Sequence, residues 1–294
     1  MTKISVVIPT LNAGSAFINL LDMLQKQSVK PNEILVVDSQ SEDETCAVAQ
    51  RAGAWVLQVM RKDFDHGGTR DMAFQKASGD IVVFLTQDAL PVDEYCIENL
   101  TEFFTDPMVA AVGGRQIAYD NARPFEKAVR AHNYPDVERI WTSQDITALG
   151  VRAFLISDVC AAYRREAYLS VGGFDRPVLT NEDMLMAEKL LHAGYKLAYT
   201  GKAKVYHSHR FTLRQEYRRN YAIGRTLKRY ESRFEYAGEA GAGMKLALDV
   251  MGDLIRKGEV KECFCFAANC AARLLGNRMG RAKESQIIRR QNRA

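Results

Sequence analysis

Acidic side chains follow two apolar segments that have the composition of buried strands. Asp38 ends the segment 33–38, and Asp88 comes shortly after the apolar run 81–85. Short runs rich in β-branched residues are typical of strands that are buried on both faces of a parallel sheet. Ligands of open α/β sheets bind where such strands end. We therefore expect a ligand site at Asp38 and Asp88, although Asp88 taken alone also suits a turn before a helix.

A glycine-rich turn with a basic side chain lies between these two segments. The stretch His66-Gly67-Gly68-Thr69-Arg70 ends a loop and begins a helix that we expect over residues 69–77. Glycine lets the backbone approach a ligand closely. Free N–H groups at a helix start, together with a guanidinium, bind phosphate. The alternative is an ordinary glycine turn beside a surface arginine.

Two further sets of titratable residues come later in the chain. Glu182 and Asp183 precede a helix expected over residues 184–194, where acids suit the first turn and keep a low pKa. His207 and His209 end a strand expected over residues 201–209, so their rings point to one face. With Asp88 they would supply three metal ligands, and a structural role for both histidines is the alternative.

The elements that must position these residues alternate along the chain. Segments with strand character at 4–10, 33–38, 54–59 and 81–85 are separated by helical patterns, of which one covers residues 16–27 and the next opens on a Ser41–Glu44 capping box. This alternation predicts a parallel sheet with crossover helices, that is, the α/β class. The glycine patterns of dinucleotide-binding and P-loop proteins are absent from the sequence.

Taken together, these motifs resemble a known family. Val6-Val7-Ile8-Pro9-Thr10-Leu11-Asn12, Leu35-Val36-Val37-Asp38-Ser39-Gln40-Ser41, His66-Gly67-Gly68-Thr69-Arg70 and Thr86-Gln87-Asp88-Ala89 occur in the order of a family 2 glycosyltransferase with the GT-A fold. The third and fourth motifs resemble the bacterial rhamnosyltransferase branch in particular. The resemblance covers roughly residues 3–230.

The resemblance implies a nucleotide-sugar donor, with dTDP-L-rhamnose as the favoured one. By position, Pro9 and Asn12 would line the nucleotide pocket, and Asp38 would bind the base or ribose. Arg70 would contact the base or the diphosphate, with His66 and Gly67 beside it, and Gln87 would also face the donor.

The resemblance also implies a divalent metal, Mg²⁺ or Mn²⁺. Gln87-Asp88-Ala89 stands where the family has Asp-x-Asp, so only Asp88 remains as a carboxylate ligand. His207 is the favoured second ligand, ahead of His209. Asp183 would be the catalytic base, and Glu182, His209, Arg218 and Arg219 are candidate diphosphate or acceptor contacts.

The C-terminal part differs in charge from the rest of the chain. Residues 210–294 hold 19 basic and 9 acidic residues. Amphipathic helices are expected at 244–255 and 261–275, followed by a frayed basic tail from residue 277. They would form a C-terminal helical extension over residues 236–294, beside a GT-A domain over residues 1–235. Such helices suit an anionic membrane surface, or else they pack on their own domain or form a homodimer.

The remaining features of the sequence indicate where the protein works and which partners it lacks. Six scattered cysteines without a CxxC pair indicate free thiols. The sequence shows neither a signal peptide nor an apolar run of about 18 residues, so we expect a cytoplasmic protein, with attachment to the inner face of the cell membrane as an extension of that idea. No recognised nucleic-acid module accompanies the basic helix at 212–231, so we expect no nucleic-acid partner.

The resulting hypothesis is an inverting glycosyltransferase. It would move L-rhamnose from dTDP-L-rhamnose to a hydroxyl of a cell-surface polysaccharide or lipid-linked saccharide. One alternative is a family 2 transferase that uses a UDP-sugar, and a second is an inactive nucleotide-sugar-binding protein. A nucleotidyltransferase is disfavoured, because the residues after the first strand, Pro9-Thr10-Leu11-Asn12, are not a glycine-rich basic loop.

Overall fold

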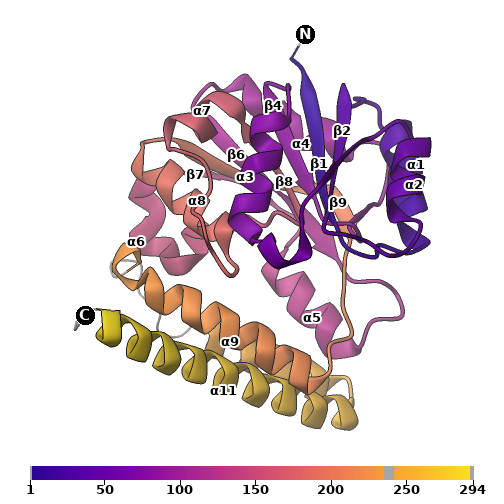
Figure 1. Cartoon of the computed structure of the whole chain (residues 1–294). Coiled ribbons are helices and arrows are strands. Elements are labelled where there is room, and N and C mark those ends of the chain that lie inside the picture. The colour runs from indigo at the N-terminus through magenta and orange to yellow at the C-terminus, as the bar shows by residue number, and fades with distance from the viewer. Residues whose placement is uncertain (1, 235–241, 292–294) are drawn as a thin grey trace.

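The computed structural model describes residues 2–234 and 242–291. Within these residues, one nine-stranded sheet has the order β3-β2-β1-β4-β8-β6-β9-β5, and β7 pairs with β9 (Figure 1). The strands are β1 (Ile4–Thr10), β2 (Glu33–Asp38), β3 (Trp55–Gln58), β4 (Ile81–Leu85), β5 (Leu90–Pro91), β6 (Val109–Ile117), β7 (Glu138–Trp141), β8 (Cys160–Arg164) and β9 (Lys196–Tyr206).

The helices cover both faces of the sheet and one of its ends. They are α1 (Ala16–Lys26), α2 (Thr45–Arg51), α3 (His66–Lys76), α4 (Cys96–Thr101), α5 (Pro124–Asn133), α6 (Ile146–Leu149), α7 (Arg165–Ser170), α8 (Glu182–His192), α9 (Leu213–Arg229), α10 (Ala242–Arg256) and α11 (Val260–Gln291). Strands β1 to β4, β6 and β9 share one direction, while β5, β7 and β8 run against it. The predicted α/β class with a mostly parallel sheet is therefore confirmed.

The apolar strands are buried because successive side chains enter two different cores. In β1, Val6 and Ile8 pack with α1, α2 and α4, whereas Val7 packs with α3, α7 and α8. In β4, Val83 and Phe84 divide in the same way. This alternation explains why both strands have runs of apolar residues without an intervening polar position. It also fixes their register, since a shift by one residue would exchange the two cores.

Several expected boundaries differ from the observed ones. The Ser41–Glu44 capping box is wrong: α2 begins at Thr45, and the Ser41 hydroxyl instead donates to Asp38, 2.5 Å away. Helix α3 begins at His66 rather than residue 69, because Asp65 accepts a hydrogen bond from the Gly68 N–H at 2.6 Å. The helix that follows Asp88, α4, is short and ends in a 3-10 turn.

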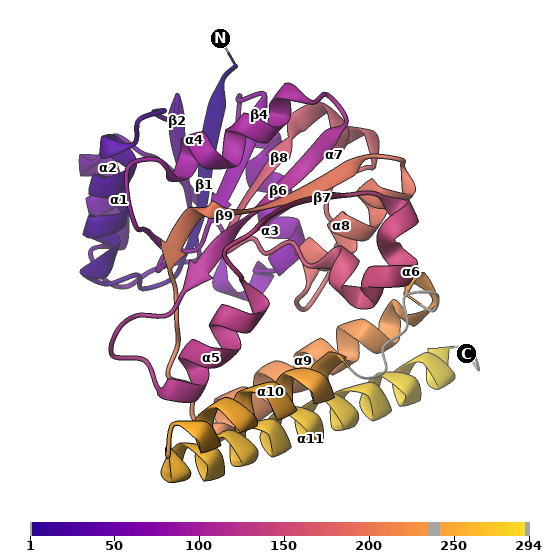
Figure 2. The same cartoon turned by 180° about the vertical axis from the view of Figure 1, so that it is seen from behind.

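Helices α9, α10 and α11 form a layer below the carboxyl ends of the parallel strands (Figures 1 and 2). The expectation of a frayed tail from residue 277 is wrong, since α11 is helical to Gln291. Gly276 and Gly280 lie one turn apart on its inner face, and a Cβ on either would collide with a carbonyl oxygen of α9. The two helix backbones therefore touch, which stabilises the second half of α11.

Charged groups reinforce this crossing. Glu284 is buried on α11 and accepts hydrogen bonds at 2.7 Å from Arg225 and Arg229 of α9. The predicted domain boundary at 235/236 lies outside the described residues and stays a prediction. All six cysteines are free, as predicted. No helix in the described part of the chain has the length and apolar character needed to cross a membrane.

Candidate functional site

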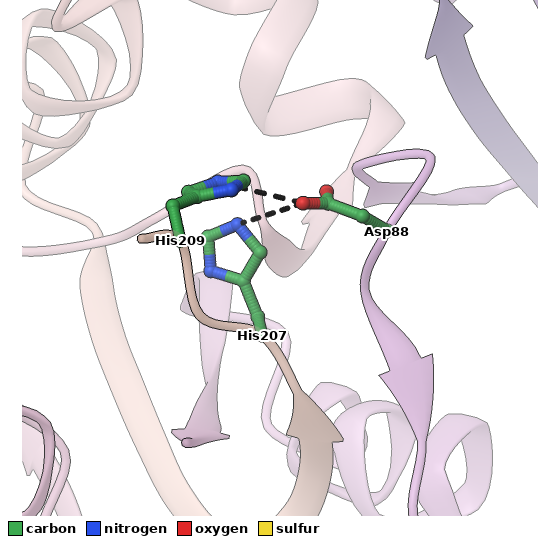
Figure 3. Close-up of side chains that lie close together, drawn as sticks. All are labelled: Asp88, His207 and His209. Atoms are coloured by element: carbon green, nitrogen blue, oxygen red, sulfur yellow. Dashed lines mark ion pairs between the residues drawn. The ribbon is translucent and has the colours of Figure 1, made fainter. Parts of the chain in front are cut away.

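Three potential metal ligands converge at the ends of two strands. Asp88 follows β4, and His207 and His209 follow β9 (Figure 3). The Nε2 atoms of His207 and His209 lie 3.6 Å and 3.4 Å from the same Asp88 oxygen. One ligand atom from each residue falls within 4.8 Å of the others. We had ranked His207 above His209, but the structure brings both rings to the carboxylate.

The surroundings of His207 set which nitrogen faces Asp88. Its Nδ1 lies 3.0 Å from the Gln116 carboxamide oxygen, which can only accept, and 3.4 Å from the Arg130 Nη1, which can only donate; the shorter contact favours a proton on Nδ1. Burial lowers the pKa of His207 well below its usual value, and the nearby Arg130 lowers it further. The neutral ring thus presents an Nε2 lone pair toward a carboxylate. Two imidazoles and one carboxylate in this arrangement fit a divalent cation, and Gln116 orients one ring as the outer partner of a ligating histidine does.

A second cluster gathers three carboxyl groups around one guanidinium. The Arg70 Nη1 lies 3.0 Å from a Glu182 oxygen, and its Nε lies 3.3 Å from Asp158. The Asp158 N–H donates to Asp183 at 3.3 Å. Arg70, Asp158 and Glu182 are each at most 6% exposed. Arg70 is therefore not the surface arginine of the simpler alternative, and its charge is shared among acids.

The excess of acids raises the pKa values of two of them. Burial raises the pKa of Asp183 to about 7, and the neighbouring Glu182 charge adds to the effect. Burial also raises the pKa of Asp158 well above its usual range. The low pKa expected for an acid at a helix start is therefore wrong for Asp183, because burial and like charge outweigh the helix end and the two N–H donors.

The expected helix cap is also absent at this position. Asn181 is the N-cap residue of α8, but its backbone is left-handed (φ +63°) and its side chain makes no capping bond. Asp183 instead accepts a hydrogen bond from the Met184 N–H at 2.8 Å. The chain there is shaped by the acidic cluster rather than by a standard cap. Asparagine tolerates the left-handed region better than most other non-glycine residues.

A cavity lies between the ends of β1, β2 and β4, beside Gln87, the residue before Asp88. Ten residues line it: Pro9, Thr10, Leu11, Ser39, Arg61, Phe64, His66, Arg70, Thr86 and Gln87. The hydroxyls of Ser39 and Thr86 are buried there without a hydrogen-bond partner among the described residues. Unpartnered buried hydroxyls are rare, so they indicate a polar ligand in this cavity.

Gln87 has a definite role in shaping this cavity. Its carboxamide accepts from the Leu11 N–H at 2.8 Å and donates to the Leu11 carbonyl at 3.2 Å. It therefore ties the end of β4 to the end of β1. An aspartate has no N–H with which to make the second bond. This observation explains why glutamine replaces the first aspartate of the Asp-x-Asp motif.

Two of the predicted nucleotide contacts are engaged within the chain. Asp38 is fully buried and accepts from the Thr10 hydroxyl at 3.1 Å and from the N–H and hydroxyl of Ser41. The Asn12 side chain accepts from the Glu42 N–H at 2.8 Å. Both residues thus hold the loops around the cavity, and neither Asp38 nor Asn12 lines it. Gly67 lies against the Asp175 carbonyl, where no Cβ would fit.

A second cavity lies beyond His209, between α5, α9 and α11. Its polar lining includes three arginines and two acids: Arg130, Arg219, Arg273, Glu126 and Glu216. Tyr134, Phe125 and Phe211 supply aromatic surface. Of the two arginines expected to contact substrate, Arg219 lines this cavity and Arg218 does not. Helix α5 forms part of the cavity wall.

Sequence reasoning missed several residues of these sites. Gln116 lies within β6 and Asp158 just before β8, and nothing in the sequence distinguished either residue from ordinary polar positions. Ligands are expected where parallel strands end, which points to residues that follow a strand. Asp158 directly precedes a buried strand, so this expectation did not identify it. The antiparallel course of β8 turns its start toward the same edge as the ends of β4 and β6. Ser39 and Thr86 directly follow β2 and β4, and this position at strand ends could have identified them as candidate ligand contacts.

Comparisons with known proteins agree with this architecture. The profile of "Glycosyl transferase family 2" matches residues 5–172. The chain is 41% identical over 224 residues to the O-antigen chain rhamnosyltransferase RfbN of Salmonella typhimurium, covering 76% of this chain and 71% of that protein. It is 38% identical over 226 residues to the O-antigen chain rhamnosyltransferase WbaN of Salmonella anatum, covering 76% and 72%.

Solved structures show the fold. The mannosyltransferase PcManGT from Pyrobaculum calidifontis, in complex with GDP-Man and Mn²⁺, has a TM-score of 0.64 at 18% identity, covering 94% of this chain and 87% of that one. TarS of S. aureus, residues 1–349 in complex with UDP-GlcNAc, has a TM-score of 0.55 at 16% identity, covering 97% and 92%. The GT-A fold is thus confirmed. With the profile and the two rhamnosyltransferases, it follows that this chain belongs to glycosyl transferase family 2 and is a nucleotide-sugar-dependent glycosyltransferase.

Proposed function

We propose that this protein transfers L-rhamnose from dTDP-L-rhamnose to a hydroxyl of a growing cell-surface saccharide of the O-antigen kind. The two rhamnosyltransferases at 41% and 38% identity support this donor and this acceptor class. A lipid-linked form of the saccharide would be the acceptor, and the reaction would take place in the cytoplasm. A UDP-sugar is the alternative donor, to be tested against dTDP-L-rhamnose.

The position of Asp88 carries the proposed arrangement of substrates. Its neighbour Gln87 lines the cavity at β1, β2 and β4, and its partner His209 lines the cavity at α5, α9 and α11. The nucleoside would occupy the first cavity, with Ser39 and Thr86 hydroxyls as its polar contacts. The diphosphate would lie at Asp88, and the acceptor saccharide would enter the second cavity beside Tyr134.

The reaction would be a single displacement with inversion. The Asp183 carboxylate takes the proton of the acceptor hydroxyl, whose oxygen attacks the anomeric carbon as the bond to the diphosphate oxygen breaks. A β-linked donor then gives an α-L-rhamnoside. A pKa near 7 suits Asp183 for this role, because the base must be ionised at working pH and still accept a proton. Arg70 holds Glu182 and Asp158 beside it.

Asp88, His207 and His209 would hold the metal ion. Bound there, the ion supplies positive charge for the leaving diphosphate. Imidazole nitrogens suit first-row transition ions better than the harder Mg²⁺, which prefers oxygen ligands. We therefore propose Mn²⁺ as the working ion, in agreement with the Mn²⁺ named for the mannosyltransferase structure.

A donor panel tests this proposal. Purified protein is offered dTDP-L-rhamnose, UDP-glucose, UDP-N-acetylglucosamine or GDP-mannose, each with Mn²⁺, Mg²⁺ or EDTA, and the released nucleotide is measured. We expect release from dTDP-L-rhamnose with Mn²⁺ and none with EDTA. Release from a UDP-sugar alone would overturn the rhamnose assignment. Binding of dTDP, measured by calorimetry, checks the nucleoside cavity independently of turnover.

A further inference from the structure

The helical layer exposes a row of large apolar side chains. On α11, Phe264 is 74% exposed and Val260 is 66% exposed. The row continues along the same helix with three more residues that are each more than half exposed: Leu274, Leu275 and Met279. These five residues are called the outer stripe of α11. At 1.5 Å per residue the stripe is about 30 Å long, which is more than a scattered surface leucine or two would produce.

The charges of α11 are segregated between its two faces. Both acidic residues of the helix point inward: Glu262 pairs with Arg123 at 3.1 Å, and the buried Glu284 pairs with Arg225 and Arg229. The exposed positions beside the stripe carry basic residues, namely Lys261, Arg278 and Lys283. The outer face of α11 therefore combines large apolar and basic side chains, and both acids of the helix lie on its inner side.

The turn between α10 and α11 extends this surface. Ile255, at the end of α10, is 65% exposed and Lys257 is exposed beside it. Glu259 is the one exposed acid between these residues and Lys283. Three large apolar and two lysine side chains thus lie within ten residues at the tip of the helical hairpin. Figure 2 shows this tip at the far edge of the helical layer, away from the N-terminus.

We propose that the outer stripe of α11 and the α10–α11 turn bind the surface of an anionic lipid bilayer. An amphipathic helix with aromatic and aliphatic residues on one side and lysine or arginine at its edges lies in the interfacial plane of a bilayer. The anionic headgroups complement the basic side chains. The bilayer would then lie beside the α5, α9 and α11 cavity, which suits an acceptor carried by a lipid.

A second copy of the chain fits this face less well. A twofold contact would place the stripe against itself, together with Lys261, Arg278 and Lys283 from both copies. Like charges at close range repel, and no acid on the exposed side of α11 would offset them. Charge complementarity therefore favours lipid over self-association.

Vesicle binding tests the proposal without donor or acceptor, so its outcome is independent of the sugar chemistry. The full chain is sedimented with vesicles of phosphatidylglycerol and phosphatidylcholine in equal parts, or of phosphatidylcholine alone. We expect binding to the anionic vesicles only, weakened by salt. Phe264→Glu should lower the partition coefficient by about tenfold or more, and Lys257→Ala and Lys261→Ala by about fivefold each.

Matched controls separate this effect from misfolding. Trp55→Glu changes a 70% exposed aromatic on the edge strand β3, far from the helical layer, and should bind vesicles as the parent does. The melting temperature of Phe264→Glu should match that of the parent, because the side chain is exposed. Equal vesicle binding by the parent and Phe264→Glu would overturn the proposal. So would a dimer in light scattering that Phe264→Glu abolishes while vesicles bind neither protein.

Discussion

Two clusters of ionisable residues, one around Arg70 and one around Asp88, lie at the same edge of the sheet. In each, the carboxyl groups have too little positive charge nearby to balance them, and the two clusters compensate in different ways. Around Arg70, three carboxyl groups share one guanidinium, and burial raises the pKa values of Asp158 and Asp183 so that protons are retained. Around Asp88, two imidazoles contribute lone pairs and no charge. The first cluster is thus organised to exchange a proton, and the second to bind a cation.

The contrast follows from the elements that carry each cluster. The acids around Arg70 come from α8 and from the residues just before β8, while Arg70 itself comes from α3, and Arg70, Asp158 and Glu182 are buried. The metal candidates come from two strand ends, where Asp88 and His209 remain partly exposed. Burial therefore raises carboxyl pKa values in one place, while access to solvent lets an ion enter in the other. Each prediction below alters one cluster and measures whether the other responds.

Asp183→Asn should produce the largest effect. Removing the base is expected to lower kcat by a factor of about 10²–10⁴, while affinity for nucleotide and metal stays unchanged. Turnover of donor and acceptor, with calorimetric titration of dTDP and Mn²⁺, measures both quantities. A variant that loses metal affinity as well would show that the two clusters are one unit.

His209→Ala should affect the other cluster alone. Loss of a direct ligand is expected to weaken Mn²⁺ binding by more than about 100-fold, since even outer partners of ligands cost 10- to 100-fold. Mn²⁺ binding is followed by electron paramagnetic resonance. His132→Ala removes an imidazole from α5 that lies outside both clusters, and it should bind Mn²⁺ as the parent does. Equal Mn²⁺ affinity in His209→Ala would remove this residue from the ligand set.

The pH profile should report the acidic cluster. With saturating Mn²⁺, kcat/KM is expected to fall about tenfold per unit as pH drops below about 7, because Asp183 must be ionised to accept a proton. Residual activity of Asp183→Asn should lack this dependence. A profile that is flat from pH 5 to 8 would contradict the assignment.

The same raised pKa has a consequence for stability with the opposite sign. An acid whose folded pKa exceeds its unfolded value favours the folded state at low pH, and this contribution is lost as pH rises toward 7. Asp183→Asn should therefore raise the free energy of unfolding at pH 8 by roughly 1–3 kcal/mol. Thermal unfolding at pH 5 and pH 8 measures the difference, which should be smaller at pH 5.

Gly280→Ala should give the smallest effect. It tests the packing of α11 against α9, the helix that follows His209 in the chain. In an exposed helix this substitution stabilises by roughly 1 kcal/mol, but here the new methyl would meet the Tyr221 carbonyl. We expect a lower melting temperature. Gly252→Ala on α10, where a Cβ finds open space up to an Arg256 atom at 3.9 Å, should raise it. Stabilisation by both substitutions would show that the α9–α11 crossing is looser than described.

The sequence predicted the parts of the molecule whose signals are local. The β1, β2 and β4 strands were recognisable because each is apolar on both faces, and Asp88 was found because it follows one of them. The pairing of His207 with His209 followed from their spacing. The fold family came from the order of the motifs, and the relatives confirm it.

Features that depend on distant partners were missed. Ser41 suited a capping box by spacing, yet Asp38 competes for its hydroxyl. The tail from residue 277 was expected to fray because it is basic and polar, whereas the missing side chains of Gly276 and Gly280 let α11 approach α9. The pKa of Asp183 was misjudged because burial, which raises it most, comes from the packing of distant segments around the start of α8.

The Gln87 amide also bears on how motifs should be compared between sequences. Aspartate in place of Gln87 would bring the chain closer to the family's Asp-x-Asp motif and at the same time remove the N–H that donates to the Leu11 carbonyl. A comparison of sequences alone would treat that substitution as an improvement of the motif, whereas in the folded chain it would remove a hydrogen bond. The altered motif is therefore weak evidence against catalytic activity, because Gln87 fixes the end of β1 and the histidines at the end of β9 are candidate metal ligands.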